Sequence, residues 1–220
     1  MCFNATVSIT TYLFGELGCL LLACLGYLPE SVFLSSVVQM QLVEFFLWKL
    51  PCSNQESISL NCAVTQVGIV INHIEPFVLW IGIHKYGGIR LPQWLDYATG
   101  SFLVITTWYT YAICMPAHCT EVTPQSYPHL YWEWNEKTGC VVFYVLFLTI
   151  TSLLCLFGLK HGNICCAITM LSYVISVVIY AGTHCVGSVW CFIAAFVPWL
   201  LSGTYYMMDK PTKNKPHKLR

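Results

Sequence analysis

The sequence predicts an all-α integral membrane protein, a bundle of about seven transmembrane helices. Hydrophobic residues make up 57% of the 220 residues and charged residues only 9%, and the mean hydropathy is +0.65. A soluble domain normally carries about 25% charged residues. A transmembrane helix needs about 20 apolar residues, so seven spans with short connections occupy nearly the whole chain. The strand-like alternation that a membrane β-barrel requires is absent from the sequence.

The first three predicted spans are separated by proline-containing, polar breaks. Apolar runs predict helices over residues 8–28, 32–50 and 58–83. The dipeptide Pro29–Glu30 separates the first two spans, and PCSNQES, which begins at Pro51, separates the second from the third. Within the third span, Pro76 cannot donate a backbone N–H and clashes with the carbonyl of Asn72. We therefore expect the helix to bend beside His73.

Four further spans follow the same pattern of apolar runs and polar breaks. They are predicted over residues 97–115, 140–159, 164–181 and 188–208. The breaks are HKYGGIRLPQ from His84, a polar stretch from Pro116 to Gly139, KHGN from Lys160 and GTHCVGS from Gly182. The predicted organisation is a seven-helix transmembrane domain over residues 1–208 and a basic tail over residues 209–220. No room is left for a second, soluble domain.

Positive charge predicts the orientation. Five of the ten Lys and Arg residues lie in the last eleven positions, and such residues gather on the cytoplasmic side of membrane proteins. The tail is then cytoplasmic and the N-terminus outside, with only Lys49 and Lys137 on the outer side. No Lys or Arg precedes Lys49, so a cleaved signal segment is not expected. The zero net charge argues against a nucleic-acid partner and favours the lipid bilayer, including anionic lipids.

Ionisable side chains interrupt the first three predicted spans, where each one costs several kcal/mol. They are Glu16, Glu44, His73 and Glu75. A rise of about 1.5 Å per residue places Glu16, Glu44 and Gln66 at one depth, with His73 about two turns below Gln66. The predicted polar column consists of Glu16, Gln41, Glu44, Gln66 and His73. Glu75 follows His73 by two residues, points to another face, and is interpreted as a bystander.

Three interpretations of this column remain open. In the first, the carboxyl groups take up protons, because no Lys or Arg lies within these spans, and their hydrogen bonds with Gln41 and Gln66 only hold the helices together. In the second, the carboxyl groups and His73 carry a proton or cation, or hold a small ligand. In the third, His73 and Glu44 bind a metal ion for enzymatic or redox chemistry. A metal ion is therefore the one cofactor that the residues suggest.

The predicted outer connections carry histidine and cysteine residues with two competing roles. The pairs His118–Cys119 and His184–Cys185 offer imidazole and thiolate groups to zinc or copper. Their spacing matches no CxxC or HxxxH site, and a disulfide between the two pairs is the favoured prediction in an oxidising compartment. The leading disulfide candidates are Cys52, Cys119, Cys140 and Cys185. Their connectivity cannot be deduced from the sequence.

The longest predicted connection contains PHLYWEWNEKTG, in which Trp132 and Trp134 flank Glu133. Aromatic residues at a membrane surface ordinarily form an interfacial belt, and this is the favoured interpretation. The alternative is a lid over the polar column, with Glu133 or Glu136 gathering cations.

Four short motifs resemble a family of uncharacterised multi-pass membrane proteins from bacteria and large DNA viruses. They are MCFNATVS at the N-terminus, QLVEFFLW at 41–48, NHIEPF at 72–77 and SVWCFIAAF at 188–196. The resemblance extends over nearly the whole chain, and the positions it points to are Cys2, Glu44, His73, Pro76 and Trp190. Asn4 replaces the usual Ser of the family's Met-Cys-Phe-Ser element, and the HIEP spacing also differs. The resemblance implies no activity.

The sequence thus predicts a membrane protein, in a host or viral membrane, that handles a proton, a cation or a small ligand at a polar centre in its first three helices. The alternatives are a metal-dependent membrane enzyme or redox protein and a non-catalytic viral or envelope component. A retinal-binding rhodopsin is not expected, because residues 188–208 contain no lysine. The late HxxxH pair of adiponectin-receptor and ceramidase-type hydrolases is missing, and no internal repeat indicates a secondary transporter.

Overall fold

The computed structural model describes residues 4–50, 55–115, 119–122, 130–132, 134, 139–180 and 186–209. These residues form helices throughout, apart from one two-stranded antiparallel sheet. The helices are α1 (Ala5–Cys24), α2 (Leu28–Lys49), α3 (Gln55–Gly82), the π-helix η1 (Ile83–Gly87), α4 (Gln93–Cys114), α5 (Cys140–Gly158), α6 (Gly162–Tyr180), α7 (Val186–Ala194) and α8 (Val197–Asp209). The strands are β1 (Glu121–Val122) and β2 (Leu130–Tyr131).

Six helical segments of the described chain are long and apolar enough to cross a membrane. They are formed by α1, α2, α3 with η1, α5, α6, and α7 with α8. The prediction of an all-α membrane bundle is confirmed. Helix α4 has 22 residues, which is sufficient length for a span, but it is not among the six, since its second half, TTWYTY, carries hydroxyl and aromatic groups in place of aliphatic ones.

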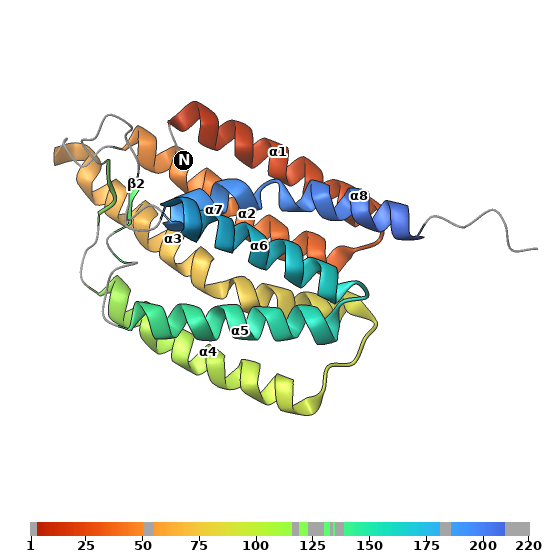
Figure 1. Ribbon diagram of the computed structural model, residues 1–220. Helices are drawn as coiled ribbons and strands as arrows, with labels where there is room; N and C mark the ends of the chain where they lie inside the picture. Colours follow the sequence, from red (N-terminus) through yellow and green to blue (C-terminus); the bar gives the residue numbers. More distant parts are fainter. Residues whose placement is uncertain are drawn as a thin grey trace, which may run out of the picture.

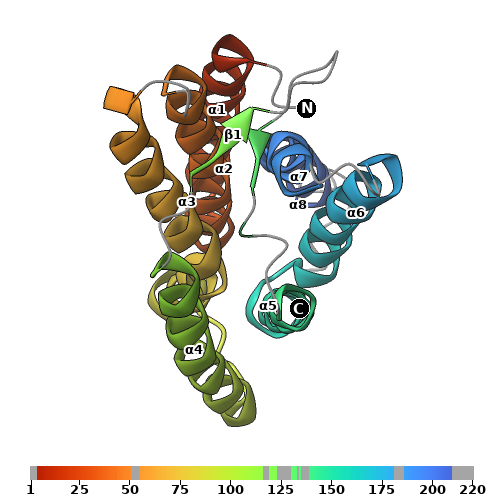
Figure 2. The ribbon, with the colours of Figure 1, turned by 90° about the vertical axis from the view of Figure 1, so that its left-hand side faces the viewer.

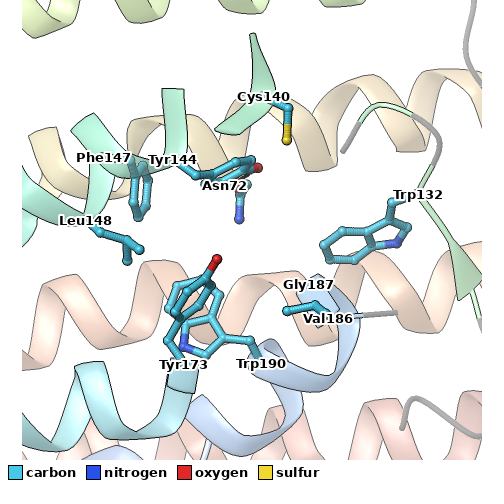
Figure 3. A pocket seen from close by; sticks show the side chains of 10 residues that line it. All are labelled: Asn72, Trp132, Cys140, Tyr144, Phe147, Leu148, Tyr173, Val186, Gly187 and Trp190. Carbon is cyan, nitrogen blue, oxygen red and sulfur yellow. Dashed lines mark hydrogen bonds between the residues drawn. The ribbon is translucent and has the colours of Figure 1, made fainter. Parts of the chain in front are cut away.

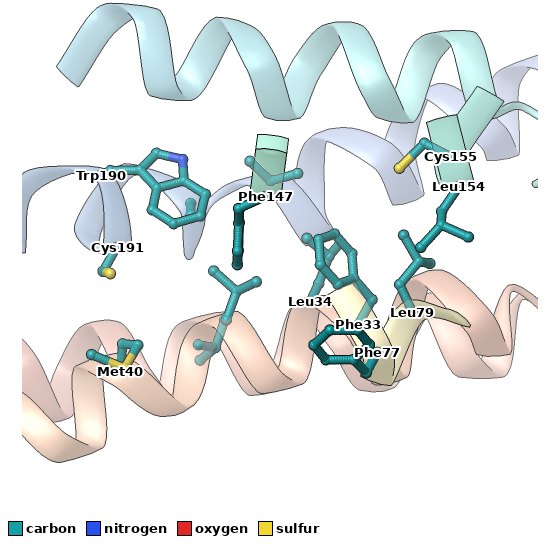
Figure 4. Close-up of a cluster of buried hydrophobic side chains, with 14 of the residues drawn as sticks. Phe33, Leu34, Met40, Phe77, Leu79, Phe147, Leu154, Cys155, Trp190 and Cys191 are labelled. Carbon is teal, nitrogen blue, oxygen red and sulfur yellow. The ribbon is translucent and has the colours of Figure 1, made fainter. Parts of the chain in front are cut away.

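The helices lie in two groups around a shared core. Helices α1, α2 and α3 pack in sequence, α8 packs on α1, and α5, α6 and α7 follow one another on the other side (Figures 1 and 2). Figure 4 shows the core between the groups, to which Phe33 and Leu34 of α2, Phe77 of α3, Phe147 of α5 and Trp190 of α7 all belong. Large apolar side chains also cover the outside of the bundle, as lipid contact requires.

The turn between α1 and α2 moves one predicted boundary. The first span was predicted to reach residue 28, but α1 ends at Cys24. Gly26 follows with a positive φ of 89°, a conformation that glycine adopts without steric cost, and its N–H donates to the carbonyl of Ala23. Helix α2 then begins at Leu28 and accepts Pro29 in its first turn, where a missing N–H costs nothing.

The last predicted span, 188–208, is interrupted. Helix α7 ends at Ala194 and α8 begins at Val197. Pro198 explains the break, because it has no N–H to donate to the carbonyl four residues earlier, which belongs to Ala194. The prediction of one continuous helix was therefore wrong, although α7 and α8 together still provide one candidate span.

The bundle has two chemically different ends, which we name the sheet end and the tail end. The sheet end holds the start of α1, the strands β1 and β2, and a disulfide between Cys62 and Cys119. The tail end holds the α1–α2 turn, η1 and the end of α8 (Figure 1). There the carboxylate of Asp209 accepts hydrogen bonds from the hydroxyl of Tyr27 and from Nζ of Lys160, which joins α8 to two helix connections.

Candidate functional site

One pair of the predicted polar column is formed in the structure. Nε2 of Gln41 donates a hydrogen bond of 2.7 Å to Oε2 of Glu44, and both side chains are completely buried in α2. Their spacing of three residues places them on adjoining faces of the helix, so the pair forms within one turn. This contact holds a carboxyl group inside the bundle next to an amide.

Other members of the predicted column have partners outside it. The carboxylate of Glu16 accepts hydrogen bonds from Oγ of Ser35 at 2.9 Å and from Nε2 of Gln39 at 2.8 Å, which links α1 to α2. Nε2 of Gln66 donates to the carbonyl of Cys114 at 3.1 Å, which links α3 to the end of α4. Similar depth therefore does not bring these groups to a common site, because each one faces a different neighbouring helix.

His73 lies in an aromatic environment between α3, α4 and α5. Its Nδ1 is 2.7 Å from the hydroxyl oxygen of Thr110, and its ring centroid lies 4.5 Å from that of Phe143 and 5.6 Å from that of Tyr109. The side chain is fully buried, and its Nε2 has no hydrogen-bond partner among the described residues. A buried nitrogen of this kind is costly, which makes His73 a candidate for function.

Glu75 corrects the sequence-based interpretation. It points away from His73, as expected for residues two apart, but this opposite face lies inside the bundle and Glu75 is 0% exposed. Within the described chain, neither of its carboxylate oxygens has a hydrogen-bond partner. Glu75 was interpreted as a bystander because it points to another face than His73, and hydropathy does not show which helices pack on that face. Glu75 and Glu44 are equally buried, and Glu75 has the less satisfied carboxyl group.

A cavity of about 140 Å³ lies between α3, α5, α6 and α7. Five aromatic side chains of the described residues line it: Trp132, Tyr144, Phe147, Tyr173 and Trp190. Its wall is completed by Asn72, Cys140, Leu148, Val186 and Gly187. Figure 3 shows the hydroxyl of Tyr173 and the amide nitrogen of Asn72 pointing into the space. The cavity therefore combines aromatic faces with a small number of polar groups, as small-molecule sites do.

Hydrogen bonds fix the orientation of the cavity wall. The hydroxyl of Tyr144 donates to Oδ1 of Asn72 at 2.8 Å, which joins α5 to α3. Nε1 of Trp190 donates to the hydroxyl of Ser172 at 3.2 Å, which joins α7 to α6. The rings of Tyr173 and Trp190 meet edge to face, with their centroids 5.9 Å apart. These contacts hold the aromatic faces in place without filling the space between them.

The two tryptophans of the longest predicted connection belong to the interior. Trp132 and Trp134 are each 3% exposed, and their rings stack with centroids 5.3 Å apart. Trp132 lines the cavity, and Trp134 lies against the ring of His73. The favoured prediction of an exposed interfacial belt was therefore wrong for these residues. The alternative of a lid over the polar column stays a prediction, and Glu133 and Glu136 lie outside the described residues.

The disulfide pairing differs from the prediction. Cys119 is bonded to Cys62 of α3 and not to a cysteine of the later connection. Asn61 adds support, because its side chain exchanges hydrogen bonds with the backbone of Thr120 at 2.9 and 3.1 Å. Cys62 was not a leading candidate, since its closeness to residue 119 depends on how α3 and α4 pack. The candidate Cys140 lines the cavity.

No group of three or more His, Cys, Asp or Glu side chains in the described ranges could hold a metal ion, and those ranges include Glu44 and His73. Cys119 is bonded to Cys62 and so offers no thiolate to a metal. The other outer candidates, for a metal or for a disulfide, lie outside the described residues. These are Cys52, His118, His184 and Cys185.

Besides the contacts of Asp209, a further ionisable cluster lies outside the predicted spans near the tail end. The carboxylate of Asp96 accepts hydrogen bonds of 2.8 Å from Nε1 of Trp80 and from Nε2 of His84. These interactions, that with Trp80 foremost, hold the pKa of Asp96 below its usual value. The cluster joins the start of α4 to the end of α3.

Comparisons with known proteins identify no relative of this chain. No family model matches it, no curated protein is significantly similar, and no solved structure has a significantly similar fold. The resemblance to an uncharacterised membrane-protein family therefore stays a prediction. Function has to be argued from the site.

Sequence reasoning missed most of the cavity wall. Aromatic residues such as Tyr144 and Tyr173 are common in membrane helices, and their spacing alone does not distinguish a packed ring from one that lines a space. Two signals were present. Asn72 and Glu75 are polar residues three apart within an apolar run, and Trp190 lies in a motif that carries the family resemblance.

Proposed function

We propose that this multi-pass membrane protein binds a small ligand in the cavity between α3, α5, α6 and α7. The observation that carries the proposal is the space of about 140 Å³ with its five aromatic rings and inward-pointing polar groups (Figure 3). Protein interiors are close-packed, and voids much larger than a water molecule are few. A space this large, with hydrogen-bonding groups at its wall, fits a ligand site better than it fits helix packing alone.

Size and chemistry restrict the ligand. An apolar cavity of about 150 Å³ in another protein accommodates benzene, so a molecule of roughly six to eight heavy atoms suits this one. The amide nitrogen of Asn72 can donate to an oxygen of the ligand, and the hydroxyl of Tyr173 can donate or accept. Both point into the space. The aromatic faces then supply most of the contact area.

Thermal unfolding of the purified full-length protein in detergent tests this proposal. The probes are benzyl alcohol, benzylamine and choline, which cover neutral, primary ammonium and quaternary ammonium chemistry. We expect at least one to raise the unfolding midpoint, since a ligand that binds only the folded state stabilises it. Leu148→Trp should fill the cavity and abolish the increase.

The matched control is Leu156→Trp, on the same helix but 48% exposed on the outside of the bundle. This variant should keep the wild-type response. If all three probes leave the midpoint unchanged, or if Leu148→Trp responds as the wild type does, the cavity is not a ligand site.

We further propose that the sheet end faces the outside and the tail end the cytoplasm. Two observations support this orientation. The disulfide between Cys62 and Cys119 lies at the sheet end, and disulfides persist in oxidising compartments. The described Lys85, Arg90 and Lys160 lie in the connections of the tail end, as expected for a cytoplasmic face. A cysteine-accessibility assay in intact cells should label a thiol introduced at Ile89 only after permeabilisation.

Proton movement is a second candidate function, and His73 favours it. Its Nε2 and the carboxyl group of Glu75 are both fully buried without partners in the described structure, on opposite faces of α3 next to Pro76. Groups of this type mark proton relays in membrane proteins. Proteoliposomes under a pH gradient should show a proton flux that His73→Ala and Glu75→Gln both reduce. A flux that neither change affects would exclude this function.

A further inference from the structure

The position of Glu75 bears on the charge of the ligand. Glu75 follows Asn72 by three residues in α3, which places the two side chains on adjoining parts of one helix face, about 4.5 Å apart along the axis. Asn72 lines the cavity. Glu75 also lies near enough to Tyr144, another residue of the wall, for the two to interact electrostatically. A carboxyl group therefore lies close behind the wall that α3 and α5 form.

This carboxyl group has no partner within the described chain. Both oxygens of Glu75 are buried without a hydrogen bond. The cationic side chains Lys49, Lys85, Arg90 and Lys160 all lie at helix ends or in connections. Glu16 offers a contrast, since Ser35 and Gln39 both donate to its carboxylate. A buried carboxyl group is stable when it is protonated, hydrogen-bonded or paired with a cation, so a cationic ligand in the neighbouring cavity would supply a partner that the described residues do not.

The rings of the cavity favour the same sign of charge. The faces of Trp, Tyr and Phe rings carry negative electrostatic potential and attract cations, and cages of such rings bind quaternary ammonium groups. Trp132, Tyr173 and Trp190 supply rings from three different parts of the chain. Among the described residues, no Lys or Arg is part of the cavity wall. The described part of the wall therefore contains no side chain that would repel a positive ligand.

We propose that the ligand of this cavity is a small organic ammonium ion, surrounded by the aromatic rings and neutralised by the carboxylate of Glu75. This inference rests on the proposed function, because it names the chemical class of the ligand for the same cavity. The ammonium group lies among the rings on the side toward α3. The amide of Asn72 and the hydroxyl of Tyr173 bind the polar remainder of the molecule.

A pair of probes of equal shape isolates the charge. Choline and 3,3-dimethylbutan-1-ol differ by the replacement of a quaternary nitrogen with carbon, and both carry a hydroxyl group. Isothermal titration of the full-length protein in detergent should show a preference for choline of at least about tenfold. Glu75→Gln should remove most of that preference and leave the affinity for the neutral alcohol within about twofold.

Glu16→Gln is the matched control, because it makes the same change at a membrane carboxyl group whose partners belong to α2. It should keep the preference for choline. If Glu75→Gln does not fold, Tyr173→Leu provides a second test. Loss of that ring should weaken choline binding more than binding of the alcohol.

Two sources of the ammonium group are distinguished by lipid composition. A free ammonium compound and the choline head group of a lipid share the same chemistry. The protein is therefore also titrated with choline in nanodiscs of phosphatidylcholine and in nanodiscs of phosphatidylglycerol. If choline binds more weakly in phosphatidylcholine nanodiscs than in phosphatidylglycerol nanodiscs, the lipid head group competes for the cavity and is the ligand. Equal choline binding in the two kinds of nanodisc identifies a free compound.

The possible failures are separate. Equal affinity for choline and the alcohol, tighter binding of the alcohol, or an undiminished preference in Glu75→Gln overturns the charge assignment but leaves the cavity as a site for a neutral ligand. The charge assignment is also overturned if neither choline nor 3,3-dimethylbutan-1-ol binds while benzyl alcohol still stabilises the protein. In that case too, the cavity stays a site for a neutral ligand. If benzyl alcohol, benzylamine and choline all fail, the proposed function itself is wrong.

Discussion

Carboxyl groups inside the bundle differ in their hydrogen-bond partners on the two sides of α3. Toward α2 and α1, carboxyl groups are supplied with donors, as in the contacts of Gln41 with Glu44 and of Gln39 with Glu16. On another side of α3, the carboxyl group of Glu75 has no partner in the described structure, and Asn72, three residues earlier, lines the cavity. Satisfied polar groups stabilise a particular packing, whereas a buried polar group without a partner calls for an explanation. This difference is the reason why we place the proposed ligand site on the second side.

The largest expected change in stability is on the side of α2, where the carboxyl group of Glu44 has a hydrogen-bond donor. Gln41→Leu removes one donor to the completely buried carboxyl group of Glu44 and should lower the free energy of unfolding by about 1 to 3 kcal/mol. Ligand-induced stabilisation should remain, because Gln41 is not part of the cavity wall. Thermal or denaturant unfolding in detergent measures both quantities. A variant as stable as the wild type would show that the pair on α2 contributes little to packing.

Glu75→Leu should change the free energy of unfolding in the opposite direction. It replaces a buried carboxyl group that has no partner among the described residues with an apolar side chain of similar size, and should raise the stability of the ligand-free protein by about 1 kcal/mol. The same variant should lose its selectivity for ammonium probes. Unfolding with and without choline tests both expectations. A loss of stability as large as that of Gln41→Leu would remove the contrast between the two sides of α3.

The surroundings of His73 lie between these extremes, since one ring nitrogen has a partner and the other has none. Thr110→Val removes the partner of Nδ1 and should destabilise the fold by about 1 kcal/mol. Thr107→Val is the control, because the hydroxyl of Thr107 is exposed and bonds only to the carbonyl of Leu103 within its own helix. Equal stability of the two variants would show that the contact of His73 with Thr110 does not contribute to the stability of the fold.

The smallest effect is expected outside the predicted spans. The folded-state pKa of Asp96 is lowered, so its interactions stabilise the protein above the usual pKa of about 4 and are lost as the pH falls through the folded value. Asp96→Asn should therefore cost at most about 1 kcal/mol at pH 7. The difference from the wild type should disappear at low pH. Unfolding midpoints measured across this range test the sign, and a difference that grows on acidification would contradict it.

Hydropathy was sufficient for the helices and for most of their boundaries. Apolar runs and Gly or Pro breaks are local properties, and they located the candidate spans to within a few residues. The interruption at Pro198 was not predicted, although its cause is local, because a proline inside a helix removes a backbone hydrogen bond. The bend expected at Pro76 stays a prediction. Local sequence features, namely apolar runs and Gly or Pro breaks, were thus sufficient to predict the helical architecture.

The site depended on information that no single helix contains. Residue spacing gives the angle between side chains on one helix, but the rotation of each helix against its neighbours is set by the packing of all of them. That rotation decided that Glu75 faces the interior, that Cys119 reaches Cys62, and that Trp132 lines a cavity. The sequence by itself determined a helical membrane protein with costly polar groups in its third helix. Only the tertiary structure decided which of those groups found partners.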